Sequence, residues 1–141
     1  VSETIGEVEA RLALPPRALP ALNPPTAPAG FTWAAESWMA QDDRAAALAR
    51  SGSYYPDHVV FLGPALPAKD HSGKPPVILT DEGAFLREGA TDAQRALLTC
   101  LSDVLRRLPA DWTAEPIGAE AEAELLDWDA EKYRQALAAR A

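Results

Sequence analysis

The sequence is poor in the residues that carry most metal and redox chemistry. It contains one cysteine, Cys100, and two histidines, His58 and His71. A lone cysteine excludes an internal disulfide and a thiolate zinc site, and two histidines fall short of a three-ligand zinc site of the hydrolase or aldolase kind. Because Cys100 lies among leucines and a valine of a predicted helix, we expect it to be a small buried hydrophobe.

Basic residues and long apolar runs are also scarce. Lysine and arginine together number 13 against 21 acidic residues, which gives a formal net charge of −8. Binding to a phosphate backbone or an anionic membrane depends on clustered positive charge, so this balance disfavours nucleic-acid and membrane partners. No run approaches the ~18 apolar residues of a membrane-spanning helix, and the acidic start of the chain does not resemble a signal peptide. We therefore expect a cytoplasmic protein.

The 141 residues are enough for one modest hydrophobic core. Residues 1–14 carry apolar Ile5, Val8 and Leu12 at helical spacing, which indicates the end of a helix from an upstream domain. Residues 15–30 contain six prolines and predict an interdomain linker. Residues 31–141 would then form a carboxy-terminal domain. Because the chain starts within helix-like sequence and without Met, we expect it to be a piece of a longer protein.

The first half of that domain gives mixed signals. Residues 31–50 fit one bent helix or two short ones, with Asp42 as an N-cap and Gly52 as a terminator. Residues 58–62 form a continuous apolar run after a proline, which predicts a short buried strand. Residues 64–76 predict a polar, mobile loop. Residues 77–80 and 84–87 flank Asp81-Glu82-Gly83 and predict a β-hairpin, with Gly83 in the left-handed conformation.

The second half is predicted to be helical. Thr91 and Gln94 form a capping-box signature for a helix that Pro109 ends. Its expected apolar face consists of Ala93, Leu97, Cys100, Leu101, Val104 and Leu108. Residues 119–139 predict a terminal helix with a break near Asp127, whose Trp128 and Tyr133 we expect to be buried. The predicted fold is α/β (α+β), with a small, partly antiparallel three-stranded sheet and three to four helices.

Few constellations point to chemistry. Asp57 and His58 could together orient a base or bind a polar ligand, but neighbouring strand residues point to opposite faces, so capping or core hydrogen bonding is favoured. His71 lies in the polar loop and is expected to be solvated. The acidic run over residues 120–131 lacks the ligand spacing of an EF-hand and predicts a solvated helix face.

Three blocks of sequence, in order, resemble one known arrangement. They are VEARLALPP at residues 8–16, YPDHVVFLGP at 55–64 and ELLDWDAEKYRQAL at 124–137. Together they resemble the carboxy-terminal third of long bacterial class II aldolase/adducin-like proteins. The resemblance implies an upstream α/β/α domain that holds a divalent metal, usually zinc, through a His-x-His pair and a histidine in an Asn-His-Gly turn. Neither motif occurs in this chain, so the resemblance implies that catalysis and the metal belong upstream.

A second likeness concerns residues 77–108. Their predicted strand, Asp-Glu-Gly turn, strand and helix resemble the metal-bearing strand, Asn-His-Gly turn, strand and helix of that family. Glu82 takes the place of the ligating histidine. A lone carboxylate without its histidine partners binds zinc weakly, so we interpret the segment as a degenerate copy kept for packing.

Two hypotheses follow. In the first, the chain is a non-catalytic accessory domain of a class II aldolase-like lyase acting on sugar phosphates or similar hydroxycarbonyl compounds. It would contact the upstream aldolase-like domain. Its role would be either to form a subunit contact in a homo-oligomer or to cover an active site. In the second, it is a small-ligand-binding or enzymatic domain in its own right that uses Asp57, His58 and Glu82. The absent histidine motifs and the proline-rich linker favour the first hypothesis.

Overall fold

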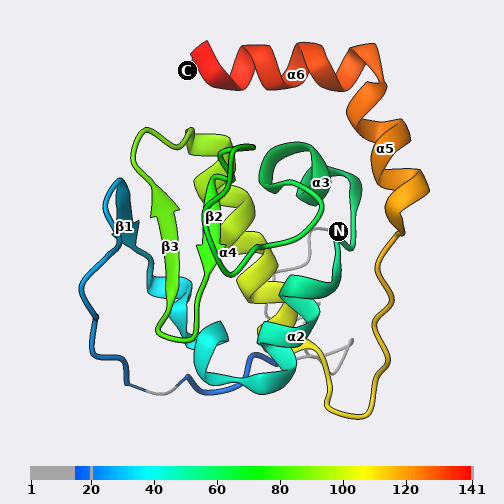
Figure 1. Cartoon of the computed structure of the whole chain (residues 1–141). Coiled ribbons are helices and arrows are strands. Elements are labelled where there is room, and N and C mark those ends of the chain that lie inside the picture. Colours follow the sequence, from blue (N-terminus) through cyan, green and yellow to red (C-terminus); the bar gives the residue numbers. More distant parts are fainter. Residues whose placement is uncertain (1–14, 20, 141) are drawn as a thin grey trace, which may run out of the picture.

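A computed structural model describes residues 15–19 and 21–140, except for the side chains of residues 129–131. The predicted helix end at residues 1–14 lies outside the described residues. The sheet consists of β1 (Phe31–Trp33), β2 (Val77–Leu79) and β3 (Ala84–Arg87). Strand β3 lies in the centre and pairs antiparallel with both neighbours, giving the order β1-β3-β2 (Figure 1). The three-stranded sheet of an α+β fold is confirmed, although its pairing is antiparallel throughout.

The described chain contains six helical segments, more than the three to four predicted. They are the 3₁₀ helix η1 (Ala35–Gln41) and the α-helices α2 (Asp43–Ser51), α3 (Pro56–Leu62), α4 (Asp92–Arg107), α5 (Ala119–Asp127) and α6 (Asp129–Arg140). Helix α4 lies behind the sheet in Figure 1, and α6 extends across the top of the view. Within residues 15–19 and 21–140, no helix is long and apolar enough to cross a bilayer.

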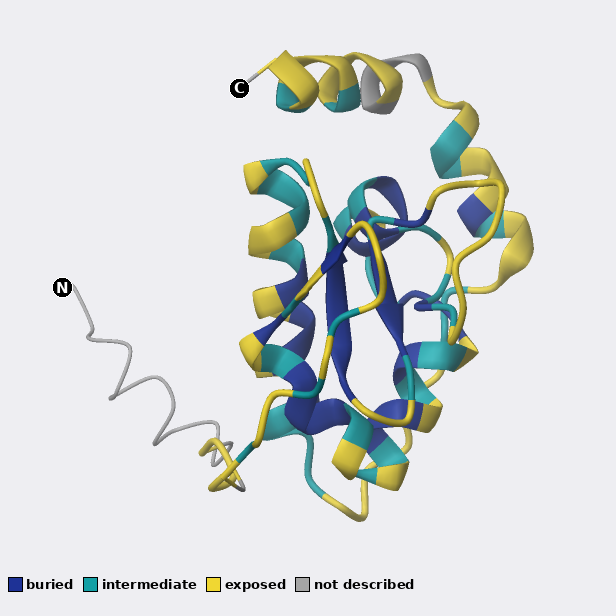
Figure 2. Ribbon diagram, turned by 60° about the vertical axis from the view of Figure 1, so that its left-hand side comes forward, coloured by how far each residue is buried: buried dark blue, intermediate teal, exposed yellow. Residues whose placement is uncertain are grey.

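The two faces of the sheet contribute to different apolar clusters because successive strand side chains point in opposite directions. On β2, Val77 and Leu79 join the main core beneath the helices, whereas Ile78 joins a smaller cluster on the opposite face. On β3, Phe85 likewise faces the smaller cluster. Figure 2 shows the buried residues concentrated on the strands and on the sides of the helices that face them.

The predicted hairpin is confirmed, but the conformation of Gly83 was predicted wrongly. Strands β2 and β3 pair from Leu79 opposite Ala84, and Gly83 is not among the described glycines with a left-handed φ. A Cβ atom at Gly83 would lie 2.8 Å from the Oγ atom of Ser37. Glycine is therefore required here because the turn lies so close to η1 that there is no room for a Cβ atom. A left-handed backbone conformation is not the reason.

Residues 58–62 belong to a helix, so the predicted central strand is wrong. Pro56 stands in the first turn of α3, where its missing N–H costs nothing. Gly63 ends the helix with a φ of 92°. A short apolar run does not distinguish a buried strand from a buried helix. The third strand is β1, at the start of the region that was predicted to be wholly helical.

The boundaries of the other helices follow their capping signals. The Asp42 side chain accepts a hydrogen bond from the Ala45 N–H at 2.9 Å and caps α2 as predicted. The Thr91 and Gln94 capping box at the start of α4 is present. The buried face of α4, however, consists of Leu98, Leu101, Ser102 and Leu105. Cys100 and Val104 are exposed, which corrects the predicted face and the predicted burial of the cysteine.

The terminal helix breaks at Trp128, as predicted, but its aromatic residues were placed wrongly. Trp128 is 58% exposed and Tyr133 is 65% exposed. We call residues 119–140, which comprise α5 and α6, the C-terminal arm. In Figure 2 most of α6 is exposed, unlike the elements of the core. Trp128, Tyr133 and Leu137 are therefore not part of the core of the domain and lie at its surface.

The proline-rich residues between 15 and 30 lie against the domain in several places. Arg17 forms a 2.9 Å ion pair with Asp42. Its backbone N–H donates to the Arg106 carbonyl, and the Arg106 Nε–H donates to the Arg17 carbonyl. Leu22 packs on the main core. The loop at residues 64–76 is also anchored at one end, because Leu66 is fully buried and its N–H donates to the Ala49 carbonyl.

Candidate functional site

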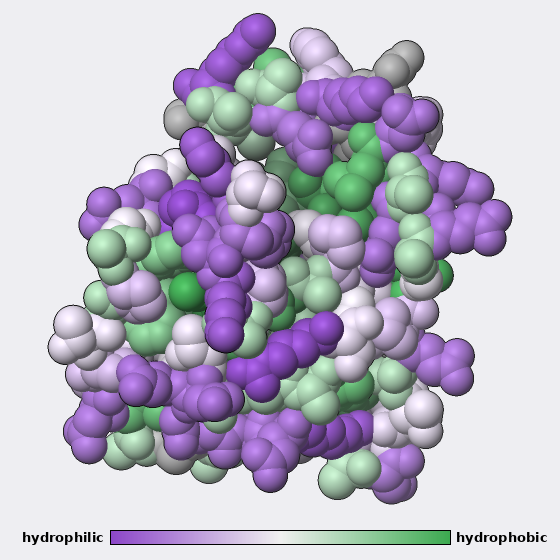
Figure 3. Space-filling view, viewed as in Figure 1, coloured by the Kyte–Doolittle hydropathy of each residue, from purple (hydrophilic) through white to green (hydrophobic). Residues whose placement is uncertain are grey.

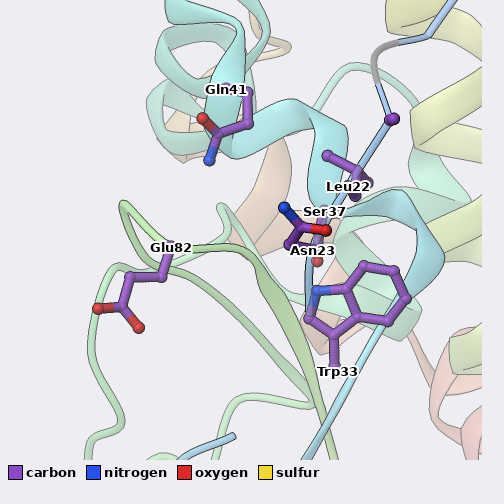
Figure 4. Close-up of a pocket in the computed structure, with 7 residues that line it drawn as sticks. Leu22, Asn23, Trp33, Ser37, Gln41 and Glu82 are labelled. Carbon is purple, nitrogen blue, oxygen red and sulfur yellow. The ribbon is translucent and has the colours of Figure 1, made fainter. Parts of the chain in front are cut away.

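A cleft of about 320 Å³ opens between the proline-rich segment, the start of the domain and the β2–β3 turn. We call it the Trp33 cleft. Its lining residues are Ala21, Leu22, Asn23, Trp33, Ser37, Gln41 and Glu82. Three segments distant in sequence thus meet at one concave surface, the arrangement typical of small-molecule sites. Figure 4 shows Asn23 and Trp33 on one side of the gap, Gln41 above it and Glu82 across from them.

The floor of the cleft is held rigidly by Ser37. This residue is 2% exposed. Its hydroxyl lies 2.7 Å from the Ala34 carbonyl and 3.1 Å from the Ala84 carbonyl, and it accepts a 2.8 Å hydrogen bond from the Ala84 N–H. These contacts tie η1 to the start of β3. Because Gly83 has no side chain, the turn that carries Glu82 can lie directly against this floor.

The polar groups around the cleft are available to a ligand. Within the part of the chain that the structure describes, the side chains of Asn23, Gln41 and Glu82 and the indole N–H of Trp33 form no hydrogen bond or ion pair. Trp33 is half-buried against the cluster of Phe31, Ile78 and Phe85, which fixes its ring. The Glu82 carboxylate is directed away from the indole in Figure 4. It therefore sets the charge at the rim and leaves the centre of the cleft to the amides and the indole.

The other two predicted site residues lie elsewhere. Asp57 and His58 are on α3, whereas the turn carrying Glu82 is at the opposite end of the sheet (Figure 1). Asp57 is half-exposed and forms a 2.9 Å ion pair with Arg134 of α6. The structure therefore does not bring Asp57, His58 and Glu82 into one site.

His58 is fully buried between two tyrosine rings. Its ring centroid lies 6.2 Å from that of Tyr54 and 5.4 Å from that of Tyr55. The Nδ1 atom accepts a long, 3.4 Å hydrogen bond from the Tyr54 N–H, while Nε2 has no partner among the described residues. Burial lowers the pKa of His58 to about 4, against the opposing effect of the Glu122 carboxylate. A neutral, inaccessible imidazole is unsuited to proton transfer with a substrate near neutral pH.

A buried carboxylate next to this histidine was not predicted from the sequence. Glu122 of α5 is 8% exposed. Its Oε1 atom accepts hydrogen bonds from the hydroxyl and the N–H of Ser53, at 2.8 and 3.2 Å. The alternating acidic residues at 120, 122 and 124 gave no sign that one of them would turn inward. The Tyr55 hydroxyl, on the ring that packs against His58, is also buried, and no hydrogen bond to it is formed within the described residues. Burial, and to a smaller extent the nearby Cys100 thiol, raises the pKa of this tyrosine.

Asn23, Trp33 and Gln41 were likewise not predicted, because they are separated in sequence and belong to no motif. Among the described residues, no group of three or more histidine, cysteine or acidic side chains is placed to hold a metal ion. No protein-family model matches the chain, and no curated protein or solved structure matches it significantly. The fold and the geometry of its surfaces therefore carry the functional argument.

Proposed function

We propose that this chain is a non-catalytic accessory domain that forms a subunit contact through its C-terminal arm. The proposed parent is a cytoplasmic class II aldolase-like lyase whose zinc site lies in an upstream domain. The observation that carries the proposal is the exposure of Trp128, Tyr133 and Leu137 on the arm, at 58%, 65% and 45%. Exposed aromatic residues gathered on one element are typical of protein interfaces.

The arm is joined to the domain largely by polar contacts. Glu122 binds Ser53, Arg134 pairs with Asp57, and the Gln135 side chain donates to the Val60 carbonyl at 2.6 Å. The Arg134 guanidinium also lies 5.5 Å from the ring centre of Phe61. Figure 3 shows an apolar area in the recess between the band of α6 and the body of the domain. The contacts position the arm and leave Trp128, Tyr133 and Leu137 exposed, while Leu125 and Leu126 are half-buried.

Helix α6 itself supports a further partner. Of residues 132–140, only Gln135 and Ala138 are half-buried, and the others are exposed. Isolated helices of this length are marginal in water, because most helical stability in proteins comes from packing one face against a neighbour. A partner that covered Tyr133 and Leu137 would provide that packing.

A second copy of the chain is the partner that we propose. Helix α5 is acidic, with Glu120, Glu124 and Asp127 exposed, whereas α6 has a small positive excess, with Lys132, Arg134 and Arg140 against Asp129 and Glu131. Within the chain Lys132 pairs with Asp127 and Arg134 with Asp57. If two arms meet about a twofold axis, α5 of each copy can face α6 of the other, which places opposite charges together. A recess of about 470 Å³ lies at the bend between the two helices, lined by Leu125 and Trp128 and by the acidic Glu124 and Asp127. It would receive side chains of the partner arm.

Sedimentation velocity over a range of protein concentrations tests this proposal. We expect the native chain to self-associate and the double substitution Trp128→Ala with Tyr133→Ala to weaken association about tenfold or more. Because both residues are exposed, the free energy of unfolding should change by only about 0.5 kcal/mol. Trp112→Ala is the matched control, because Trp112 is 51% exposed but lies outside the arm.

Two results would contradict the proposal. The native chain could remain monomeric at every concentration, or the Trp112→Ala variant could lose association as fully as the arm variant. A large loss of stability in the arm variant would instead show that these aromatic residues are part of the core.

A further inference from the structure

We infer that the Trp33 cleft binds a small, uncharged polyhydroxyl compound of monosaccharide size. This inference is independent of the proposed subunit contact, because the cleft lies on the proline-rich segment, η1 and the β2–β3 turn rather than on the C-terminal arm. The size of the cleft, the side chains around it and their charge define the ligand.

The size of the cleft limits the ligand. At about 320 Å³, it falls at the lower end of the roughly 300 to 1,000 Å³ typical of ligand sites. Its floor is Ser37, whose hydroxyl is already engaged by backbone groups on both sides. The site is thus preformed, and binding requires little ordering of the protein.

The side chains around the cleft match hydroxyl groups attached to a carbon ring. The amides of Asn23 and Gln41 can each donate and accept hydrogen bonds, as a hydroxyl does. The Trp33 indole supplies a flat apolar surface for C–H groups and an N–H donor. Figure 4 shows the Gln41 amide directed toward the gap that Asn23 and Trp33 border. All three groups lack partners among the described residues, so a ligand would not displace existing hydrogen bonds.

The charge of the cleft argues against a phosphorylated ligand. Glu82 stands at the rim and the neighbouring Asp81 side chain is fully exposed, while no lysine or arginine belongs to the described lining. Arg50 lies 3.7 Å from Asp81 but donates its hydrogen bonds to the Leu79 carbonyl. A phosphate group would therefore meet negative charge without the cationic donors that usually bind it.

Titration of the ¹⁵N-labelled chain with D-ribose and D-glucose, and separately with their phosphate monoesters, tests the inference by NMR. We expect millimolar free sugar to shift the resonances of the Trp33 indole N–H and of the Asn23 and Gln41 side-chain amides. The double substitution Asn23→Ala with Gln41→Ala should weaken binding about tenfold or more, because it removes two hydrogen-bonding partners. Thr26→Ala, at an exposed position of the same segment outside the cleft lining, is the control.

A substitution at Glu82 tests the effect of charge on ligand choice. We expect the phosphate monoesters to bind the native chain more weakly than the free sugars do. Glu82→Gln should raise the affinity for the phosphate monoesters relative to that for the free sugars, because it removes a negative charge from the rim of the cleft. The inference is overturned if neither free sugar shifts the cleft resonances or if the double variant binds as tightly as the native chain. Tighter native binding of the phosphate monoesters than of the free sugars would also overturn it.

Discussion

The Oε1 atom of Glu122 lies 2.8 Å from the hydroxyl of Ser53, at a point where both residues are buried. The same oxygen accepts the Ser53 N–H, so one carboxylate of α5 satisfies two donors of the segment between α2 and α3. Beside it, a Cβ atom at Gly52 would lie 2.6 Å from the Pro116 side chain. The C-terminal arm therefore begins at a tightly fitted polar contact, although most of α6 beyond it is exposed.

Removing this carboxylate should loosen the arm. Glu122→Ala leaves the Ser53 N–H and hydroxyl buried without an acceptor, and we expect a loss of about 1 to 3 kcal/mol in the free energy of unfolding. Glu122→Gln keeps a carbonyl acceptor and should cost less. Urea denaturation measures both, with Glu124→Ala on the exposed side of α5 as the control. If Glu122→Ala lowers the free energy of unfolding no more than Glu124→Ala does, the contact with Ser53 contributes little to stability.

Stability should depend on pH through His58. Its folded-state pKa of about 4 lies below the ordinary value of 6.5. The unfolded chain therefore binds a proton first as the pH falls, and stability is lost between about pH 6.5 and pH 4. Between about pH 7.5 and pH 5, protonation of His58 in the unfolded chain should lower the free energy of unfolding by roughly 2 kcal/mol. His58→Asn, which preserves an acceptor near Nδ1, should flatten the profile of unfolding free energy against pH.

The exposed His71 provides the control for that experiment. His71→Gln should leave the profile over the same range unchanged, because its ring lies at the surface of the 64–76 loop. If the two histidine variants have equal slopes, the buried imidazole does not cause the pH dependence.

The contact between Trp38 and Ser102 should stabilise the core. The Trp38 indole N–H donates to the Ser102 hydroxyl at 2.7 Å, and both residues are buried. Ser102→Ala leaves this donor unsatisfied, so we expect a loss of about 1 to 3 kcal/mol by thermal or urea unfolding. Ser72→Ala in the exposed loop should change stability by less than about 0.5 kcal/mol. Similar small effects for both variants would mean that the indole finds another acceptor.

Gly83→Ala should destabilise the hairpin through Ser37. The new Cβ would meet the Ser37 Oγ at 2.8 Å, and that hydroxyl is held by three backbone contacts. We expect a cost of about 1 to 3 kcal/mol, as for overpacking in a core. In a Ser37→Ala background the cost of Gly83→Ala should fall, since the nearest atom is gone. Additive effects of the two substitutions would rule out the steric explanation.

The features that depend on neighbouring residues could be predicted from the sequence. The Thr91 and Gln94 capping box, the Asp42 cap, the hairpin around residues 80–83 and the helix break after Asp127 were all predicted correctly. Each depends on side-chain to backbone hydrogen bonds, turn propensity or apolar alternation over a few residues, and such signals need no tertiary partner.

Tertiary packing determines which faces are buried and which distant residues meet. Helix α4 has apolar residues on two adjoining stripes. The stripe with Leu98 and Leu105 is buried, together with Ser102, which accepts a hydrogen bond from Trp38. Cys100, on the other stripe, is exposed. Residues 58–62 suit a strand or a helix equally by hydrophobicity. The Trp33 cleft joins residues 21–23, 33–41 and 82, and Trp128 is left at the surface by the path of the arm. Burial and long-range proximity arise from how elements pack, and residues far apart in the chain carry no local signal of that packing.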